Sequence, residues 1–212
     1  MTTNIFDGLE ADDGALARLH QRLEHDAHTA DVLDVAYRTI DTPVGTLLLA
    51  ATTAGLVRVA YDVEGHDAVL AGLADRISPR VLRAPARLDS AARQIDEYFA
   101  KRRTVFEVPV DLRLADGFRR DVIDHLRDIA YGHRESYATV AAAIGHPRAV
   151  RAVGTACAHN PLPVVIPCHR VVRSDGSTGQ YVGGPLAKST LLDLEAACKR
   201  ERKRVRRGRT RT

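Results

Sequence analysis

The sequence predicts an α+β protein, in which a small mixed domain precedes a mainly helical one. Strand-like apolar runs fill the first third of the chain, whereas helical patterns dominate its second half. A hydrophobic content of 45% in 212 residues is enough for one large or two small cores. We divide the chain into an N-terminal extension (1–34), a first domain (35–112), a second domain (113–197) and a tail (198–212).

The N-terminal extension carries one helical pattern. Leu16, Leu19 and Leu23 recur at helical spacing within residues 11–29, which predicts an amphipathic helix leading into the first domain. This part of the chain is acidic, because residues 1–50 hold nine Asp and Glu against three Arg.

The first domain opens with three strand-like runs, at residues 35–40, 46–51 and 56–61. Turn-forming segments rich in Asp, Pro and Gly separate these runs, which predicts a meander. Helices are expected at 66–77 and 90–101, followed by a strand at 104–110. No acidic catalytic cluster is evident here, so we expect this domain to have a supporting role.

A core helix should open the second domain. It is marked by apolar residues at helical spacing, namely Phe118, Val122, Leu126 and Ile129.

Two short helices joined by a glycine turn follow, in the outline of a helix-turn-helix. Ser136 is placed to cap the first, which should reach residue 144, because a serine hydroxyl accepts from a first-turn amide. Gly145 and His146 break the pattern, and Pro147 opens a second helix that ends near residue 158.

The composition of the second helix favours DNA binding. Residues 148–156 are mostly small, which lets a helix approach a nucleic-acid groove closely while its arginines reach outward. The same small residues could instead pack against another helix, and many helix-turn-helix outlines bind nothing. Both interpretations stay open on these residues alone.

A cysteine beside a histidine is the strongest chemical signal in the chain. It lies in Ile166-Pro167-Cys168-His169-Arg170, after an apolar run at 164–166 that predicts a short buried strand. Cys168 and His169 can cooperate only if the chain turns at Pro167, because successive strand residues face opposite sides. A thiol of pKa about 8.5 is mostly protonated at neutral pH, and His169 or Arg170 would raise its thiolate fraction. The alternative is a buried cysteine that only packs.

A carboxylate is needed to orient such a histidine. Residues 185–200 predict a helix whose apolar side includes Leu191, and Glu195 lies on that side. We therefore predict that Cys168, His169 and Glu195 form a catalytic triad. The alternative is that Glu195 is a solvated helix residue.

The cysteine count excludes several kinds of site. Cys157, Cys168 and Cys198 are too few and too badly spaced for a disulfide framework or a four-thiolate zinc site. The histidines make a weak metal signal, so we expect no metal and no cofactor. We expect Cys157 to be packed in the second helix and Cys198 to be exposed.

Hydropathy indicates the cellular location of the protein, and charge indicates the character of its C-terminal tail. There is no apolar run of membrane-spanning length and no signal pattern at the start, which favours a soluble, cytoplasmic protein. Residues 198–212 hold nine Lys and Arg against one Glu, which predicts a disordered basic tail that could continue the last helix for a turn or two. Such a tail would either contact phosphates irrespective of sequence or have no role.

A set of residues in the second domain resembles a known family. The match spans residues 118–195 and is dense: Tyr137, Arg151-Ala152-Val153-Gly154, Asn160-Pro161, Pro167-Cys168-His169-Arg170, Gly179, Tyr181-Val182-Gly183-Gly184, Lys188 and Glu195. In order and spacing these residues resemble the O6-alkylguanine-DNA alkyltransferases, also called methylated-DNA-protein-cysteine methyltransferases. The first hundred residues match that family only in outline.

The resemblance implies a fold and a mode of DNA binding. The first domain would be ribonuclease-H-like, and the second helix of the helix-turn-helix would enter the minor groove of duplex DNA, with Ala149, Ala152 and Gly154 at the contact. Arg151 would enter the base stack where the damaged nucleotide has left. Tyr137 would assist the rotation of that nucleotide, because base chemistry inside a duplex requires the base to leave the stack.

The resemblance also implies a reaction. Cys168 would take the alkyl group from O6-alkylguanine, His169 would act as base through a water, and Glu195 would orient His169. Asn160 would brace the helix-turn-helix against the active-site turn. The substrate pocket would be lined by Tyr137, Val171, Tyr181, Val182 and Gly183. A thioether has no easily expelled group, so one molecule should repair one lesion.

The implied partner is duplex DNA carrying O6-alkylguanine, with O4-alkylthymine left open as a second substrate. No cofactor is implied, and a monomer is the default state. Two residues depart from the family pattern: Val182 stands where many members have serine, and Ala130 where a proline is usual. We expect Val182 to alter the tolerance for bulky alkyl groups.

Three other functions compete with this one. A cysteine hydrolase could use the same Cys-His-Glu set on an acyl substrate, although the helix-turn-helix with Arg151 disfavours it. A non-catalytic lesion binder would leave Cys168 idle. A sequence-specific transcription factor is disfavoured because the second helix offers few base-reading side chains.

Overall fold

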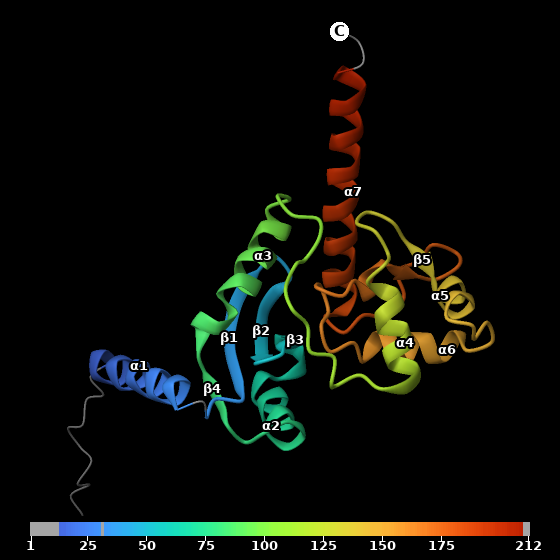
Figure 1. The fold of residues 1–212 in the computed structure, drawn as a ribbon. Coiled ribbons are helices and arrows are strands. Elements are labelled where there is room, and N and C mark those ends of the chain that lie inside the picture. Colours follow the sequence, from blue (N-terminus) through green and yellow to red (C-terminus); the bar gives the residue numbers. More distant parts are fainter. Residues whose placement is uncertain (1–12, 31, 210–212) are drawn as a thin grey trace, which may run out of the picture.

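The computed structural model describes residues 13–30 and 32–209, and it has the predicted α+β architecture (Figure 1). A mixed sheet with helices forms the N-terminal half, and helices dominate the C-terminal half. Helix α7 (Gly184–Arg209) begins between the two halves and projects away from them (Figure 1).

A four-stranded sheet of order β3-β2-β1-β4 underlies the N-terminal domain. The strands β1 (Val35–Thr42), β2 (Gly45–Thr52) and β3 (Gly55–Tyr61) form the predicted antiparallel meander. The fourth strand, β4 (Val81–Arg83), runs parallel to β1. It lies outside the predicted strands because three residues are too few to show an alternating pattern.

Helices α2 (His66–Arg76) and α3 (Asp89–Phe99) match the predicted helices closely. The short 3-10 turns η1 (Asp62–Glu64) and η2 (Pro85–Leu88) precede them. Helix α3 buries Ile95 and Tyr98 in a core cluster that continues into the C-terminal half through Leu126 and Leu191. The two halves therefore share one apolar core, which fixes α3 against the second domain.

The strand expected at residues 104–110 does not form. This segment meets the sheet only through a bridge between Val110 and Leu56, flanked by the hydrogen bond from Leu56 N to Pro109 O at 2.8 Å. Pro109 has no amide to donate, and the amide of Glu107 donates instead to the Gln94 side chain at 2.8 Å. The segment is therefore an extended linker between the two halves.

Helix α1 (Asp13–Thr29) forms where the leucine spacing predicts it. Its leucines do not pack on the domain, since Leu16, Leu19 and Leu23 are 56%, 64% and 54% exposed. The helix is tied to the sheet through a hydrogen bond between His20 Nε2 and Arg83 O at 2.7 Å. Residues 1–12 of the predicted extension lie outside the described residues.

The helix-turn-helix consists of α5 (Tyr137–Ala143) and α6 (Val150–Ala158), which both pack on α4 (Gly117–Leu126). The predicted cap on α5 is confirmed, because Ser136 Oγ accepts from Thr139 N at 3.0 Å. Helix α6 begins three residues later than expected, at Val150 rather than Pro147. Residues 146–149 instead form a turn closed by Ala149 N donating to His146 O at 2.8 Å.

The remaining elements surround the reactive segment. The strands β5 (Glu135–Ser136) and β6 (Val171–Val172) form a two-stranded parallel sheet, and the 3-10 turn η3 (Cys168–Arg170) precedes β6. Helix α7 runs as helix through Arg209, beyond the end expected near residue 200. None of the described helices is both long and apolar enough to cross a bilayer.

Candidate active site

The residues before the thiol form a tight turn and not the strand expected at residues 164–166. Val164 has a φ of 72°, which is unusual for a β-branched residue, and Ile166 N donates to Leu162 O at 2.8 Å. Asn160 stabilises the turn: its Nδ2 donates to Ile166 O at 2.9 Å, and its Oδ1 accepts from Leu162 N at 3.0 Å. The expectation of a strand was wrong because this side chain takes the backbone groups that a strand would pair.

Cys168 opens η3 and is 2% exposed. Its Sγ accepts a hydrogen bond from Asn160 Nδ2 at 3.1 Å. Burial raises the pKa of the thiol to about 11, although the Asn160 hydrogen bond and the charge of Lys188 oppose this. The resting group is therefore a protonated thiol, and the expected rise in thiolate fraction does not occur in the resting site.

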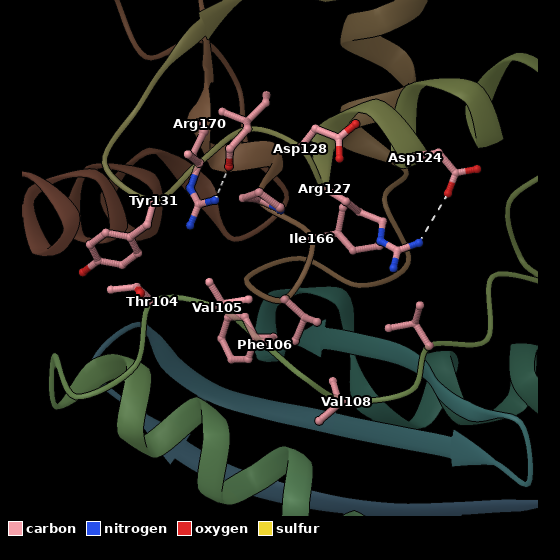
Figure 2. A pocket seen from close by; sticks show the side chains of 15 residues that line it. Thr104, Val105, Phe106, Val108, Asp124, Arg127, Asp128, Tyr131, Ile166 and Arg170 are labelled. Carbon is pink, nitrogen blue, oxygen red and sulfur yellow. Dashed lines mark hydrogen bonds and ion pairs between the residues drawn. The ribbon is translucent and has the colours of Figure 1, made fainter.

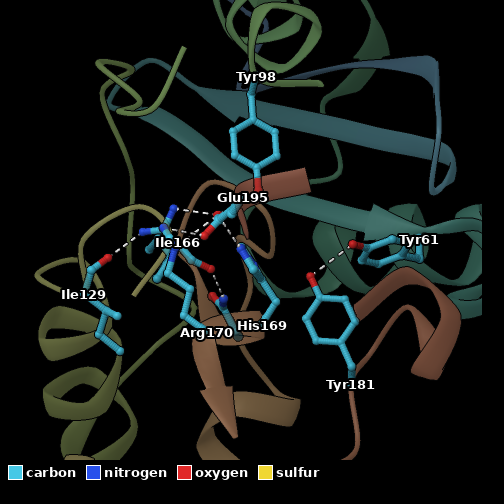
Figure 3. Close-up of polar contacts among 10 residues, drawn as sticks. Tyr61, Tyr98, Ile129, Ile166, His169, Arg170, Tyr181 and Glu195 are labelled. Atoms are coloured by element: carbon cyan, nitrogen blue, oxygen red, sulfur yellow. Dashed lines mark hydrogen bonds and ion pairs between the residues drawn. The ribbon is translucent and has the colours of Figure 1, made fainter. Parts of the chain in front are cut away.

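His169 and Glu195 are joined by a hydrogen bond of 3.0 Å between Nε2 and Oε1 (Figure 3). Both side chains are buried. Burial lowers the pKa of His169, so the imidazole is neutral near pH 7. When Nε2 carries the hydrogen and donates to Glu195, Nδ1 is left as an acceptor, and no described protein atom bonds to it. The geometry suits a base whose tautomer is set by the carboxylate.

Arg170 contacts Glu195 and not the thiol. The sequence pattern did not indicate this contact. Its Nη2 donates to Oε1 at 2.8 Å, its Nε lies 3.1 and 3.0 Å from Oε1 and Oε2, and its Nη1 donates to Ile129 O. Burial alone would raise the pKa of Glu195, but hydrogen bonds from His169 and Arg170 hold that pKa well below its usual range. Glu195 is therefore a carboxylate at neutral pH.

Two tyrosines of the N-terminal domain reach the site, and sequence reasoning missed both (Figure 3). Tyr98 of α3 is fully buried, and its hydroxyl donates to Glu195 Oε1 at 2.9 Å. Tyr61, at the end of β3, has its hydroxyl 3.0 Å from the hydroxyl of Tyr181. No local pattern marks either contact, because each joins residues far apart in the chain.

The residues predicted to contact DNA lie on and beside α6. Arg151 and Ala152 are exposed, whereas Ala149 and Gly154 are half-buried. Tyr137 lies between α6 and the loop that contains Gly179: a Cβ built on Gly154 would be 4.0 Å from its ring, and one built on Gly179 would be 3.0 Å from its hydroxyl. The half-buried Tyr137 thus connects α6 to the segment that precedes α7.

The predicted substrate-pocket residues other than Tyr137 follow the thiol along the chain. Val171 is buried, and Tyr181, Val182 and Gly183 are half-buried. Glycine is needed at position 183, because a Cβ there would lie 2.5 Å from the ring of Tyr61. The segment therefore packs closely against the N-terminal domain.

Lys188 is a buried cation beside this segment. It is 0% exposed, its Nζ donates to Val171 O at 2.7 Å, and it lies 5.8 Å from the centroid of the Tyr137 ring. Burial lowers its pKa, and the negative charge of Cys168, when that group is a thiolate, opposes the shift. The predicted apolar side of α7 is confirmed, because Leu191 and Glu195 are both buried, as are Lys188 and Leu192.

A cavity of about 380 Å³ borders the active-site turn at the junction of the two domains (Figure 2). Phe106 and Val108 of the linker line one wall, and Ile166 and Arg170 line another. Cys168 is not among its lining residues. This cavity is therefore separate from the residues predicted to receive a substrate.

The other cysteines and the acidic groups do not add a second site. Cys157 is 7% exposed in α6, as expected, whereas the side chain of Cys198 lies outside the described part. Within residues 13–30 and 32–209, no group of three or more His, Cys, Asp or Glu side chains is placed to hold a metal ion.

Two family models match the chain, and together they cover both domains. Residues 35–112 match the ribonuclease-like domain of 6-O-methylguanine DNA methyltransferase. Residues 117–197 match the DNA-binding domain of the same family.

Curated proteins and solved structures give the same result. A methylated-DNA--protein-cysteine methyltransferase from Mycolicibacterium paratuberculosis is 37% identical over 161 residues, which cover 76% of this chain and 92% of that protein. The crystal structure of O6-methylguanine methyltransferase from Mycobacterium tuberculosis superimposes with a TM-score of 0.68 at 36% identity, covering 77% of this chain and 93% of that one. A structure of the M. tuberculosis protein in complex with DNA gives a TM-score of 0.67 at 36% identity, covering 77% and 94%.

Proposed function

The chain belongs to the 6-O-methylguanine DNA methyltransferase family, and from this premise we propose that it repairs duplex DNA by transferring the alkyl group of O6-alkylguanine to its own Cys168. One observation carries the proposal. The buried thiol of Cys168, which accepts a hydrogen bond from Asn160, lies next to a buried His169–Glu195 pair. O4-alkylthymine is a second possible substrate of the same chemistry.

Removal of the thiol proton is the first chemical step. With a pKa of about 11, the thiol at pH 7 is ionised in on the order of one molecule in 10⁴. A base must therefore take the proton during the reaction. His169 is neutral and its Nδ1 has no protein partner among the described residues, so we assign it this role, with a water carrying the proton. Glu195 then stabilises the imidazolium that forms.

The thiolate next attacks the alkyl carbon. The new S–C bond forms as the bond from that carbon to guanine O6 breaks, and the electron pair moves onto the purine. Donors near the purine must stabilise this charge until a proton reaches it. We assign this role to the hydroxyl of Tyr137 and to backbone amides near Tyr181 and Val182. The thioether product has no easily expelled group, so each molecule reacts once.

The alkylated guanine must leave the DNA duplex to reach a buried thiol. We propose that α6 lies in the minor groove, with Ala149, Ala152 and Gly154 against it, that exposed Arg151 fills the vacated place in the stack, and that Tyr137 faces the flipped nucleotide. A fluorescent base analogue beside the lesion tests this. Arg151→Ala should reduce the fluorescence change on binding at least several-fold, whereas Arg93→Ala, an exposed residue of the N-terminal domain, should leave it intact.

Intact-protein mass spectrometry tests the transfer. After incubation with a duplex that carries one O6-methylguanine, the protein should gain one methyl group and saturate at one equivalent. Cys168→Ser should gain none, whereas Cys157→Ser, which replaces the other buried cysteine of the described residues, should still react. Tight binding to the lesion without added mass would favour a non-catalytic lesion binder. Absence of both binding and transfer would favour a hydrolase.

The proposed substrate also suggests the oligomeric state and the cellular location of the protein. We propose that the protein acts as a monomer on chromosomal DNA in the cytoplasm, without a cofactor. Sedimentation of the protein alone and with a short duplex tests the monomer.

A further inference from the structure

Glu195 receives hydrogen bonds from both domains. From the C-terminal domain it accepts from His169, from Arg170 and from the amide of Gly132, which lies 2.9 Å from Oε2. From the N-terminal domain it accepts from the hydroxyl of Tyr98, 2.9 Å from Oε1 (Figure 3). Among the described residues, Tyr98 is the one side chain of the N-terminal domain that bonds to this carboxylate.

We infer that Tyr98 is a positioning residue for alkyl transfer, which fixes Glu195 Oε1 toward His169 and thereby makes the N-terminal domain part of the active site. The inference rests on the proposed function, because it takes Glu195 as the group that orients the base.

The contacts of Glu195 differ in whether they distinguish its two carboxylate oxygens. Arg170 Nε lies 3.1 Å from Oε1 and 3.0 Å from Oε2, so this contact does not distinguish the two oxygens, whereas Arg170 Nη2 donates to Oε1 at 2.8 Å. Tyr98 bonds to Oε1 alone, and Gly132 bonds to Oε2 alone. The terminal torsion of a glutamate is broad, so such one-oxygen contacts are needed to hold the carboxylate plane. Without Tyr98, Oε1 keeps only Arg170 and His169 as donors among the described residues, so the carboxylate is held less firmly toward His169.

The surroundings of Tyr98 hold its hydroxyl in place. The ring is fully buried, with centroids of Phe99, Phe106 and Tyr131 at 5.4, 5.3 and 5.9 Å. Burial raises the pKa of Tyr98 well above its usual value, so the hydroxyl stays a neutral donor at all pH values at which the protein would act. Phenylalanine at this position would keep the ring contacts and remove only the hydrogen bond.

Loss of this donor should also change the proton affinity of His169. Tyr98 and His169 donate to the same oxygen, so removing Tyr98 leaves more negative charge for the imidazole proton and raises the pKa of His169. The other titratable or charged groups that face the pair are Arg170 and Cys168 of η3, Lys188 of α7, and the tyrosines Tyr131 and Tyr181. Tyr98→Phe leaves all of these in place.

The test measures the rate of methyl transfer from an O6-methylguanine duplex across pH. Tyr98→Phe should lower the rate about 10-fold near pH 7, the effect of losing a hydrogen bond to a charged group. The acid limb of its pH profile should move to higher pH, because His169 must be neutral to accept the proton. Tyr37→Phe is the matched control, since Tyr37 packs in a different cluster of the same domain. It should keep the wild-type rate and profile.

A double-mutant cycle separates positioning from a loss of stability. If Tyr98 acts through Glu195, then Tyr98→Phe should cost little further rate in a Glu195→Gln background. Full additivity, or an unchanged rate and pH profile in Tyr98→Phe, would overturn the inference, and so would a rate loss shared by Tyr37→Phe. Failure of the wild-type protein to transfer any methyl group would instead refute the proposed function and this inference with it.

Discussion

Asn160 and Cys168 are joined by a hydrogen bond of 3.1 Å from the amide Nδ2 to Sγ. The same Nδ2 donates to Ile166 O, so one side chain both shapes the active-site turn and contacts the thiol. Asn160 lies two residues beyond the end of α6 (Val150–Ala158) and is 1% exposed. A movement of α6 would therefore be transmitted to the sulfur through this side chain.

Replacing Asn160 by alanine should weaken both the fold and the reaction. The substitution leaves Ile166 O and Leu162 N without their side-chain partner in a buried turn, which should cost about 2–3 kcal/mol in the free energy of unfolding. It also removes a hydrogen bond that lowers the pKa of the thiol, so transfer should slow further at neutral pH. Urea unfolding and single-turnover kinetics measure the two effects. Wild-type stability would contradict the bracing role.

Local patterns predicted the elements well, because their causes are local. The meander, α2, α3 and the Ser136 cap follow from alternation, helical spacing and a hydroxyl next to a free amide. The apolar side of α7 follows in the same way. Residues 104–110 and 164–166 were wrongly predicted as strands, since the alternatives depend on the distant Gln94 side chain and on Asn160.

The site was predicted in part for the same reason. Cys168, His169 and Glu195 could be proposed from neighbouring positions and from one helical face. Tyr98 could not, because its contact with Glu195 spans 97 positions and depends on how α3 docks against the second domain. The high pKa of Cys168 depends on burial, which no local pattern reports.

Lys188→Met should make the thiol less reactive. Lys188 is buried near Cys168 and lowers the pKa of that thiol, so a neutral side chain of similar length should let the pKa rise. A higher pKa means less thiolate at any given pH. The pH profile of the rate at which iodoacetamide alkylates Cys168 should therefore shift to higher pH. Peptide mapping distinguishes Cys168 from the other cysteines. An unshifted profile would show that the charge of Lys188 does not act on the sulfur.

Acid should weaken the fold through Glu195. Its pKa is lowered in the folded protein to about 2, against about 4.3 in an unfolded chain. The unfolded state therefore binds the proton more tightly, so the stabilisation of about 1–3 kcal/mol is present above pH 5 and is lost as pH falls toward 2. Glu195→Gln should have a lower Tm at pH 7 and a smaller fall in Tm between pH 5 and 3. Glu107→Gln, at an exposed residue, is the control and should show the wild-type fall in Tm between pH 5 and 3.

Val182→Ser should alter the selectivity between alkyl groups. Val182 is half-buried in the proposed pocket and carries an apolar side chain, where serine would supply a hydroxyl. Single-turnover rates on methyl and benzyl adducts measure the effect. We expect the ratio of the two rates to change, and an unchanged ratio would assign the position no role in selectivity.

Gly183→Ala should slow transfer by moving the proposed pocket segment. A Cβ at this position would lie 2.5 Å from the Tyr61 ring, so either that ring or the segment must shift. Tyr61 is 2% exposed and has little room, and we therefore expect the segment from Tyr181 to move and the transfer rate to fall at least 10-fold. Gly72→Ala is the matched control: no atom lies within 4 Å of its Cβ, and in a helix it should add about 0.5–1 kcal/mol of stability. Equal rates for both variants would show that contact with Tyr61 does not position the pocket.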